Sequence, residues 1–340
     1  MNWARYILHR IGLAFVQVAA IWLLTFLIMR VIPANPAYRI AGFNTTPENI
    51  HRIEVELGLD KPIWLQLWDQ VSALFHGDLG RSLSTGNSVW DDLVQRVPAT
   101  LELVWLGLAV AVLIAIPLGV WAARGRGGFA QRVVRAYSLL AGSQPDYWWG
   151  LALVFIFFVC LKVVPGPVGR LPIGMSAPNR ITGSYVLDSV LTGNWVTLQA
   201  ALGQLILPIT TIVIVYMPSI LKMTVATYRD GMNAESVRLM RASGVGDFRV
   251  SMIALRLASL PIVATIGIAA AYLLGAAALI ETVFGINGAA RYAVKAAIVS
   301  DYPGLQGVVL AIAALAAFAY LVTDIVQIVL DPRLRSAGPE

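Results

Sequence analysis

The chain is poor in charged residues and nearly lacks cysteine. Charged residues make up 13% of its 340 residues, against about a quarter in soluble domains. Hydrophobic residues make up 58%, and the mean hydropathy is +0.73. This apolar excess is too large for one globular core, which excludes a disordered chain and an ordinary soluble enzyme. The single cysteine, Cys160, excludes an intrachain disulfide.

Motifs for catalysis or metal binding are also absent from the sequence. The three histidines, His9, His51 and His76, lie far apart and have no metal-ligand spacing. There is no phosphate-binding GxxxxGK[ST] loop and no GxSxG nucleophile motif. We therefore expect a chain that is not an enzyme and holds neither a metal nor a cofactor.

Long apolar runs are the main positive feature. A membrane-spanning helix needs about 20 apolar residues, because the hydrocarbon layer is about 30 Å thick. The sequence predicts six spans, in residues 11–29, 103–123, 136–161, 189–221, 257–280 and 302–323. The fourth run is too long for one span, and we expect roughly its residues 201–221 to lie in the bilayer.

The connections between these runs alternate in basic charge. Residues 124–135 contain four arginines and no acid, and residues 222–256 contain six basic residues. Because short basic connections stay in the cytoplasm, both termini are expected inside, in a multi-pass membrane protein. Residues 31–34 make a poor signal-peptide cleavage site, so we expect the first apolar run to be retained as a helix.

A few acidic residues lie in or beside the predicted spans. Asp146 follows Pro145 inside the third run, and an ionisable group at such a depth is a functional candidate. A structural role for Asp146 at the end of the helix stays open. We interpret Glu281 and Asp324 as helix-end residues at the membrane interface.

Residues 222–256 form the most informative connection. We expect Asn233 to cap a short amphipathic helix over residues 234–243, which Gly244 ends. A second helix is predicted over residues 248–260, stopped by Pro261. This arrangement fits either a helix lying in the lipid interface or a lever that docks on a cytoplasmic partner.

The first connection, between residues 30 and 102, has a more soluble character. Pro47 and Glu48 indicate a helix start, and an amphipathic helix is predicted over residues 63–75, followed by a turn at residues 77–80. We expect this helical extracytoplasmic insertion to cap the bundle or to dock an external substrate-binding protein.

Seven short motifs occur in one order along the chain. They are LGLDKP at 57–62, GDLGRS at 77–82, PATLEL at 98–103, LILP at 205–208, ETVFG at 281–285, DYP at 301–303 and DPRLR at 331–335. In these motifs the chain resembles the B-type permease subunit of the dipeptide/oligopeptide ABC importers. The resemblance covers nearly the whole chain, from Arg5 to Arg335.

The resemblance implies an all-α polytopic fold of the type I importer permease class, with six transmembrane helices in the bacterial cytoplasmic (inner) membrane. It implies a second homologous permease subunit, two ATPase subunits that bind ATP and Mg²⁺, and an extracytoplasmic substrate-binding protein, with no nucleic acid. It also implies that residues 222–258 couple to the ATPases. The general coupling motif is Glu-Ala-Ala-x3-Gly. Gly244 matches its glycine, but Arg238, Leu239 and Met240 replace the first three residues. The residues expected to couple to the ATPase are Glu235, Arg238, Arg241 and Gly244.

Polar and aromatic residues of the third to fifth spans are candidates for lining a translocation pathway. They are Ser143, Gln144, Asp146, Trp148, Tyr216, Met217 and Tyr272. Tyrosine and tryptophan also occur as interfacial anchors, which leaves that alternative open. Pro208 and Pro218 fit either gate points or fixed kinks.

The sequence therefore predicts a transport subunit, with a self-sufficient channel or secondary transporter, or a membrane scaffold, as rivals. The substrate is expected to be a short peptide or a related small solute such as glutathione, a nickel chelate or an opine. The chain is divided into a tail and first helix (1–30), the insertion (31–99), the permease core (100–335) and a tail (336–340).

Overall fold

A computed structural model describes residues 3–31, 36–41, 46–125 and 128–331. These residues form helices and, apart from a single bridge between Arg81 and Ser88, contain no strand. The helices are α1 (Trp3–Val31), α2 (Pro36–Ala41), α3 (Pro47–Glu56), α4 (Ile63–Phe75), α5 (Val89–Arg124), α6 (Phe129–Ala141), α7 (Asp146–Leu153), the π-helix η1 (Val154–Cys160), α8 (Tyr185–Leu191), α9 (Trp195–Asn233), α10 (Glu235–Ala242), α11 (Asp247–Val283), α12 (Ala289–Ile298) and α13 (Tyr302–Leu330). Residues 32–34 of the proposed cleavage site, residues 332–335 of the last motif and the tail 336–340 lie outside the described residues.

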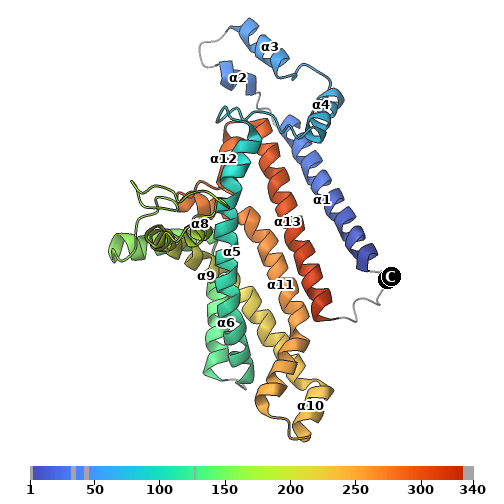
Figure 1. Ribbon diagram of the computed structural model, residues 1–340, viewed down its shortest axis with the longest axis vertical. Coiled ribbons are helices and arrows are strands. Elements are labelled where there is room, and N and C mark those ends of the chain that lie inside the picture. Colours follow the sequence, from blue (N-terminus) through green and yellow to red (C-terminus); the bar gives the residue numbers. More distant parts are fainter. Residues whose placement is uncertain (1–2, 32–35, 42–45, 126–127, 332–340) are drawn as a thin grey trace.

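Five of these helices are long and apolar enough to cross a membrane. They are α5, α9, α11, α13 and residues Leu8–Val31 of α1. A shorter apolar helix, Asp146–Cys160, accompanies them. Figure 1 shows the long helices side by side, with α2–α4 at one end of the bundle and α10 at the other. We call these the insertion end and the α10 end. This arrangement agrees with the all-α polytopic fold expected from the sequence.

The centre of the bundle is formed by α5, α9 and α11, which pack through small residues. A Cβ atom at Gly107 of α5 would lie 2.7 Å from Ile212 Cδ1 of α9, and one at Gly119 would lie 2.7 Å from Thr224 Cβ. Such distances are too short for any side chain, so glycine is what lets these two backbones approach closely. Helix α1 lies at the edge, where only 6% of its most apolar window is buried.

The third predicted span is not one continuous helix, which corrects the prediction for residues 136–161. Helix α6 ends at Ala141, and α7 begins at Asp146 after a break. Pro145 has no backbone N–H to donate and disfavours helical geometry at the residue before it. The apolar part that remains, α7 with η1, is therefore shorter than the other spans.

Pro261 does not stop a helix, so the predicted end at residue 260 is wrong. Helix α11 continues through this proline to Val283. Backbone oxygens around it find partners, because Gln327 of α13 donates to the Leu260 carbonyl at 3.3 Å. The hydroxyl of Thr265 donates to the Pro261 carbonyl at 2.8 Å. Neighbouring helices and hydroxyls commonly satisfy a proline-interrupted membrane helix in this way.

The insertion matches its predicted helices. Helix α3 begins at Pro47, where the Thr46 side chain accepts a hydrogen bond from the Asn49 N–H. Helix α4 covers residues 63–75, as predicted. The turn after it contains Gly77 and Gly80, whose φ angles of 75° and 80° favour glycine. The cap that was predicted for α10 is wrong, because Asn233 is the last residue of α9 and the N-cap is Ala234, which lacks a capping side chain.

Candidate functional site

Helix α10 is a short amphipathic helix between the two long helices α9 and α11. Its Val237 side chain is fully buried against the bundle, whereas Leu239 is 68% exposed. At about 100° per residue, Glu235 and Leu239 project about 160° away from Val237 and Arg238 about 100° away from it, and all three are exposed. We call these three residues the outward face of α10. It combines two charges of opposite sign with an apolar side chain, and no described residue covers it.

The turn after α10 depends on Gly244, which has a φ of +79°. Its N–H donates to the Arg241 carbonyl, and the Val245 N–H donates to the Met240 carbonyl, both at 3.1 Å. These bonds cap the helix through a left-handed residue, which glycine adopts without strain. Of the four predicted coupling residues, Gly244 thus shapes the turn, while Glu235 and Arg238 lie on the outward face.

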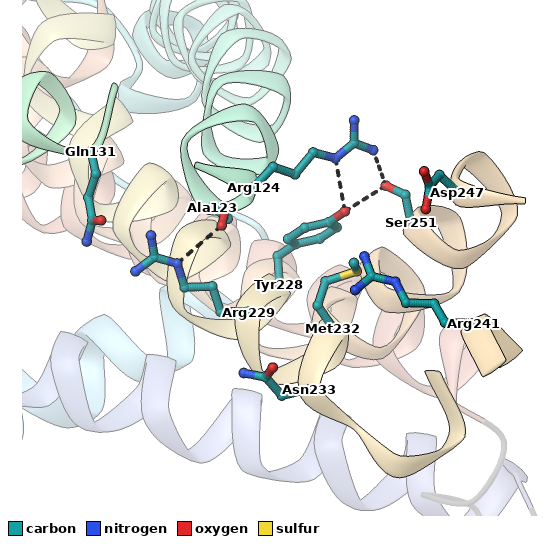
Figure 2. A pocket seen from close by; sticks show the side chains of 10 residues that line it. All are labelled: Ala123, Arg124, Gln131, Tyr228, Arg229, Met232, Asn233, Arg241, Asp247 and Ser251. Carbon is teal, nitrogen blue, oxygen red and sulfur yellow. Dashed lines mark hydrogen bonds between the residues drawn. The ribbon is translucent and has the colours of Figure 1, made fainter. Parts of the chain in front are cut away.

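Arg241, the fourth predicted coupling residue, lies on the other side of α10. It lines a cavity of about 610 Å³ at the α10 end, together with residues of α5, α6, α9 and α11 (Figure 2). Asp247, at the start of α11, lines the same cavity. Among the described residues Arg241 makes no ion pair within 4 Å.

Three long helices are tied together beside this cavity. Arg124, the last residue of α5, donates to the Tyr228 hydroxyl at 3.3 Å and to the Ser251 hydroxyl at 2.5 Å. Tyr228 of α9 and Ser251 of α11 also share a hydrogen bond of 2.8 Å. Figure 2 shows the three side chains meeting at one point. This triad therefore joins α5 to both helices that flank α10.

Three of the predicted pathway residues come together in the structure. The Tyr216 hydroxyl of α9 donates to Asp146 Oδ2 at 2.7 Å, which joins α9 to the start of α7. The rings of Tyr216 and Tyr272 lie 6.2 Å apart. Tyr216 is buried, whereas Tyr272 of α11 is 68% exposed on the surface of the chain. Together they form a polar, aromatic strip across α7, α9 and α11.

The other pathway candidates do not join this strip. The Ser143 hydroxyl donates to the Leu140 carbonyl at 2.8 Å, within the break between α6 and α7. Trp148 packs edge-on against Trp149, with ring centroids 5.0 Å apart. Met217 is buried in the core, and the exposed side chain of Gln144 makes no hydrogen bond to another described residue.

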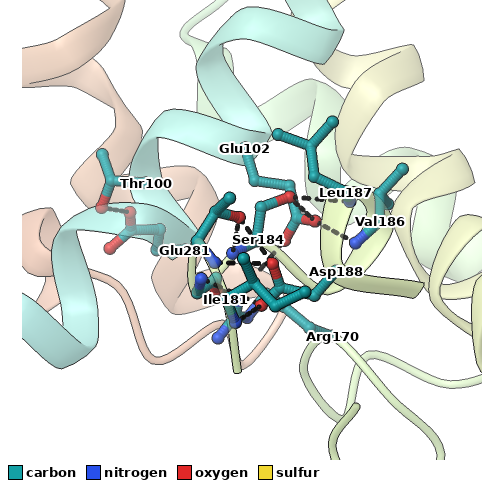
Figure 3. Close-up of polar contacts among 11 residues, drawn as sticks. Thr100, Glu102, Arg170, Ile181, Ser184, Val186, Leu187, Asp188 and Glu281 are labelled. Atoms are coloured by element: carbon teal, nitrogen blue, oxygen red, sulfur yellow. Dashed lines mark hydrogen bonds and ion pairs between the residues drawn. The ribbon is translucent and has the colours of Figure 1, made fainter. Parts of the chain in front are cut away.

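A buried ion pair at the insertion end was missed by the sequence reasoning. Arg170 donates to Glu102 Oε2 at 3.1 Å, and both side chains are at least 89% buried in the described chain (Figure 3). The other oxygen of Glu102 accepts from the Ser184 hydroxyl and the Val186 N–H, both at 2.7 Å. The guanidinium of Arg170 also lies over the Tyr185 ring at 3.6 Å. The pair thus fixes the long loop before α8 onto α5.

Glu281 is fully buried, which corrects its interpretation as a helix-end residue at the membrane interface. Its Oε1 accepts from the Thr100 hydroxyl at 2.5 Å, and its Oε2 accepts from the Arg291 N–H at 2.7 Å. Thr100 in turn accepts from the Ala289 N–H at 2.8 Å. Glu281 therefore joins α11, α5 and α12 rather than facing lipid headgroups.

Asp188 holds a loop by accepting several hydrogen bonds at once. Its Oδ1 accepts from the Thr182 N–H and hydroxyl, both at 2.7 Å. Its Oδ2 accepts from the Gly183 N–H at 2.9 Å and the Ile181 N–H at 3.2 Å. Burial raises the pKa of Asp188, but these hydrogen bonds outweigh it and hold the pKa below its ordinary value.

Two of the seven motifs also meet in space. Asp301, from DYP, accepts from the Ser82 hydroxyl of GDLGRS at 2.5 Å and from the Ser84 hydroxyl at 2.8 Å. Thr100 of PATLEL and Glu281 of ETVFG are the pair described above. These contacts are structural, and the described residues contain no group of three His, Cys, Asp or Glu side chains that could hold a metal.

The chain matches two family profiles. Residues 115–336 match the "Binding-protein-dependent transport system inner membrane component" family. Residues 3–104 match "Binding-prot-dependent transport system membrane comp, N-term". The first match covers well over half of the chain. The chain belongs to this permease family.

Curated relatives match the permease over nearly its whole length. It is 36% identical over 328 residues to the "Probable D,D-dipeptide transport system permease protein DdpB" of Escherichia coli K12, covering 95% of each chain. It is 33% identical to the dipeptide transport system permease protein DppB of the same strain, covering 97% of this chain and 98% of the relative. It is also 33% identical, with the same coverage, to the di/tripeptide transport system permease protein DppB of Pseudomonas aeruginosa UCBPP-PA14. The permease is thus a multi-pass membrane protein of the type I permease fold.

Proposed function

We propose that this permease forms half of the translocation pathway of an ATP-driven importer of short peptides. Its partners would be a second, homologous permease subunit, two cytoplasmic ATPase subunits and an extracytoplasmic substrate-binding protein. The observation that carries this proposal is the outward face of α10, set between two helices that run the length of the bundle.

The outward face suits docking on a soluble partner. Arg238 and Glu235 can pair with charges of opposite sign, and Leu239 can enter an apolar groove. The triad of Arg124, Tyr228 and Ser251 would then carry a displacement of α10 into α5, α9 and α11. ATP binding by the partner would favour one arrangement of the helices and thereby shift the population between inward- and outward-facing states.

The α10 end is assigned to the cytoplasm by charge. Residues 124–135 and 222–256, which include the start of α6, α10 and the start of α11, contain ten basic residues. Basic segments of this kind are retained inside, so both termini would lie in the cytoplasm and the insertion on the outer side. An external binding protein would then approach the insertion end.

The substrate class rests on the relatives, which are named as permeases of dipeptides and of di- and tripeptides. A short peptide is therefore the proposed substrate, and glutathione, a nickel chelate or an opine are the alternatives to screen. The strip of Asp146, Tyr216 and Tyr272, which is exposed at Tyr272, would face the second permease subunit across the pathway, where hydroxyl and carboxylate groups can replace water around a peptide.

The coupling role is tested by reversing one charge on the outward face. We expect Arg238→Glu to weaken ATPase binding by about 10–100-fold, because a lost charge-assisted contact costs about 1.5–3 kcal/mol. The measurements are copurification of the ATPase subunits and peptide-stimulated ATP hydrolysis in proteoliposomes. Arg132→Glu, an equally exposed change on α6 at the same end, is the control. Full stimulation in the Arg238→Glu complex would contradict the proposal.

The rival function, a self-sufficient channel or secondary transporter, predicts a different result in the same vesicles. The purified chain alone would then take up peptide when driven by an ion or proton gradient. We expect no such uptake without the ATPase subunits and ATP. Gradient-driven uptake by the chain alone would replace the importer proposal with the rival.

A further inference from the structure

Helix α4 of the insertion has an aromatic stripe that faces away from the protein. Trp64, Trp68, Val71 and Phe75 follow one another at spacings of 4, 3 and 4 residues. At about 100° per residue they fall within about 60° of one another around the helix. Trp64, Trp68 and Phe75 are 71%, 69% and 82% exposed. We call these four residues the α4 stripe.

The rotation of α4 is fixed by its opposite side. The side chain of Gln66 is buried, accepting from Arg30 Nη2 at 3.1 Å and Arg30 Nε at 3.2 Å. It also donates to the carbonyls of Lys61 at 2.8 Å and Leu59 at 3.2 Å. These bonds hold the Gln66 side of the helix against the bundle. These contacts therefore fix the orientation of α4 so that the α4 stripe faces outward.

The same contact sets the depth of α4 relative to the membrane. Arg30 is the next-to-last residue of α1, and the span within α1 runs from Leu8 to Val31. Because Gln66 is bonded to Arg30, α4 lies at the level where this span ends. Figure 1 shows α4 beside that end of α1. This is the level at which tryptophan side chains gather in membrane proteins, with the ring partly in the acyl region.

The end of α1, to which α4 is hydrogen-bonded, also exposes apolar side chains. Leu27, Ile28 and Val31, in the last turn and a half of α1, are 44%, 49% and 82% exposed. On a span at the edge of the bundle, such side chains are expected to contact acyl chains. The apolar surface thus continues from α1 toward α4, where the aromatic residues begin.

Charge on α4 lies on a different side from the stripe. Asp69, about 100° further round the helix than Trp68, pairs with Lys61 at 2.7 Å. Both side chains are about half exposed, as expected for a pair in water. A helix with an aromatic side and a charged side at the end of a span has the form of a helix that lies in the membrane interface.

We propose that α4 is an interfacial anchor, which inserts Trp64, Trp68 and Phe75 into the boundary between headgroups and acyl chains. The α4 stripe therefore contacts the lipid surface and not another protein. The partner subunits are instead expected at the exposed strip of Tyr272 and at the outward face of α10, both away from this edge. Anchoring at α4 would hold the insertion down on the bilayer beside the entrance of the bundle.

The proposal is tested with a fluorophore placed on either side of α4. In a Cys160→Ser background, Trp68→Cys and Asp69→Cys are labelled with an environment-sensitive dye. The full-length chain is then placed in nanodiscs of phosphatidylethanolamine and phosphatidylglycerol. A lipid with a doxyl quencher near the headgroup end of its acyl chain is included. We expect this quencher to lower the Trp68→Cys emission at least about twofold, since interfacial helices bury their apolar side about 5–10 Å deep. The neighbouring Asp69→Cys label should stay unquenched.

Two further observations keep the test decisive. Val71→Cys, a smaller change on the same stripe, should behave like Trp68→Cys, which covers the case in which loss of a tryptophan disturbs folding. Absence of quenching at both stripe positions would overturn the proposal. Emission typical of a dye in water would show that the stripe is solvent-exposed. Emission that shifts only when the binding protein is added would show that the stripe contacts that protein instead of lipid.

Discussion

Individual buried carboxylates determine how the insertion end is built. Glu102, Glu281 and Asp188 each accept at least two hydrogen bonds, and each joins segments that are distant or irregular. A buried carboxylate is costly unless both oxygens are satisfied. These residues therefore act as fixed points, and removing one oxygen leaves buried N–H donors without a partner.

Asp188→Asn is expected to destabilise the permease measurably at neutral pH. Either oxygen of Asp188 accepts two hydrogen bonds, so an amide NH₂ in its place leaves two donors unsatisfied. We expect a cost of about 2 kcal/mol, or a fall of about 3 °C in the unfolding temperature of the detergent-solubilised chain. Glu56→Gln, which removes only a surface ion pair, should change little.

The pH dependence of that difference follows from the lowered pKa of Asp188. The stabilising contribution of a carboxylate with a lowered pKa is complete above the unfolded value, near pH 4, and is lost as the pH falls through the folded value. The gap between the native chain and Asp188→Asn should therefore be constant from pH 7 to about pH 5 and should close only below about pH 4. A gap that closed at neutral pH would contradict this origin.

Residue contacts of this kind could be predicted only in part. The sequence identified Asp146, Tyr216 and Tyr272 as pathway candidates, and the structure brings these three together. It gave no indication that Glu102 pairs with Arg170, because the two residues are 68 positions apart and their meeting depends on the fold of the loop before α8. Glu281 was placed wrongly because its position near a helix end says nothing about what packs over that end.

At the scale of elements, the coupling role proposed for α10 depends on how closely α9 and α11 approach. A Cβ atom at Gly231, near the end of α9, would lie 2.6 Å from the Ala254 carbonyl oxygen of α11. The obstacle is backbone, so it cannot rotate away. The two helices must separate if a side chain is added there.

We expect Gly231→Ala to destabilise the permease by about 1–3 kcal/mol, the usual cost of an added methyl in a packed interface. In the assembled complex it should also reduce peptide-stimulated ATP hydrolysis, because α10 is displaced with α9. Gly203→Ala, in the same helix, is the matched control, since nothing lies within 4 Å of a Cβ atom there. This control should gain up to about 1 kcal/mol from helix propensity alone. Equal effects of the two substitutions on unfolding temperature would contradict the packing argument.

The ends of helices and turns were predicted best where they depend on the local sequence alone and not on contacts with distant residues. Helix α4 and the turn at Gly77 and Gly80 matched, because amphipathic spacing and glycine φ angles are local properties. Boundaries set by proline were predicted poorly, in opposite directions. Pro145 interrupts a run that was predicted to be continuous, whereas Pro261 lies within a helix that was predicted to stop. The difference arises because neighbouring side chains such as Gln327 hydrogen-bond to the backbone beside Pro261, and the sequence alone does not show which side chains lie there.

At the scale of the whole molecule, the two exposed edges of the bundle differ in chemistry. The edge formed by α1 presents apolar side chains such as Phe15, 70% exposed. The strip on α7, α9 and α11 presents Tyr272, 68% exposed, beside a tyrosine and an aspartate. This contrast agrees with the proposal that one edge faces lipid and the other a water-filled pathway.

This contrast predicts different cysteine reactivity at the two edges. In a Cys160→Ser background, Tyr272→Cys in the assembled complex should react with a hydrophilic thiosulfonate reagent at least about tenfold faster than Phe15→Cys. The reason is that the reactive thiolate does not form in hydrocarbon. The measurement is the rate of labelling in nanodiscs, and unfolded chains of both variants should react equally. Comparable slow labelling of the two variants would mean that the strip also faces lipid.

The overall architecture was the most predictable level. Apolar runs longer than about 20 residues specify spans almost regardless of tertiary detail, and five long helices with a shorter apolar helix are present. The packing of these helices was not predictable, because it depends on which small residues face each other. The contact of Gly107 with Ile212 is one example.

The length of α9 has a geometric consequence for the transport cycle. Its 39 residues form a rod of about 58 Å, tied near one tip by Tyr228. Tyr216, with its bond to Asp146, lies two residues from the midpoint of the rod. A rotation of about 10° about that midpoint would move the two tips about 5 Å in opposite directions while leaving the Tyr216 bond almost unstretched. The helix would then pivot about the hydrogen bond between the Tyr216 hydroxyl and the Asp146 carboxylate, so that its two ends move in opposite directions.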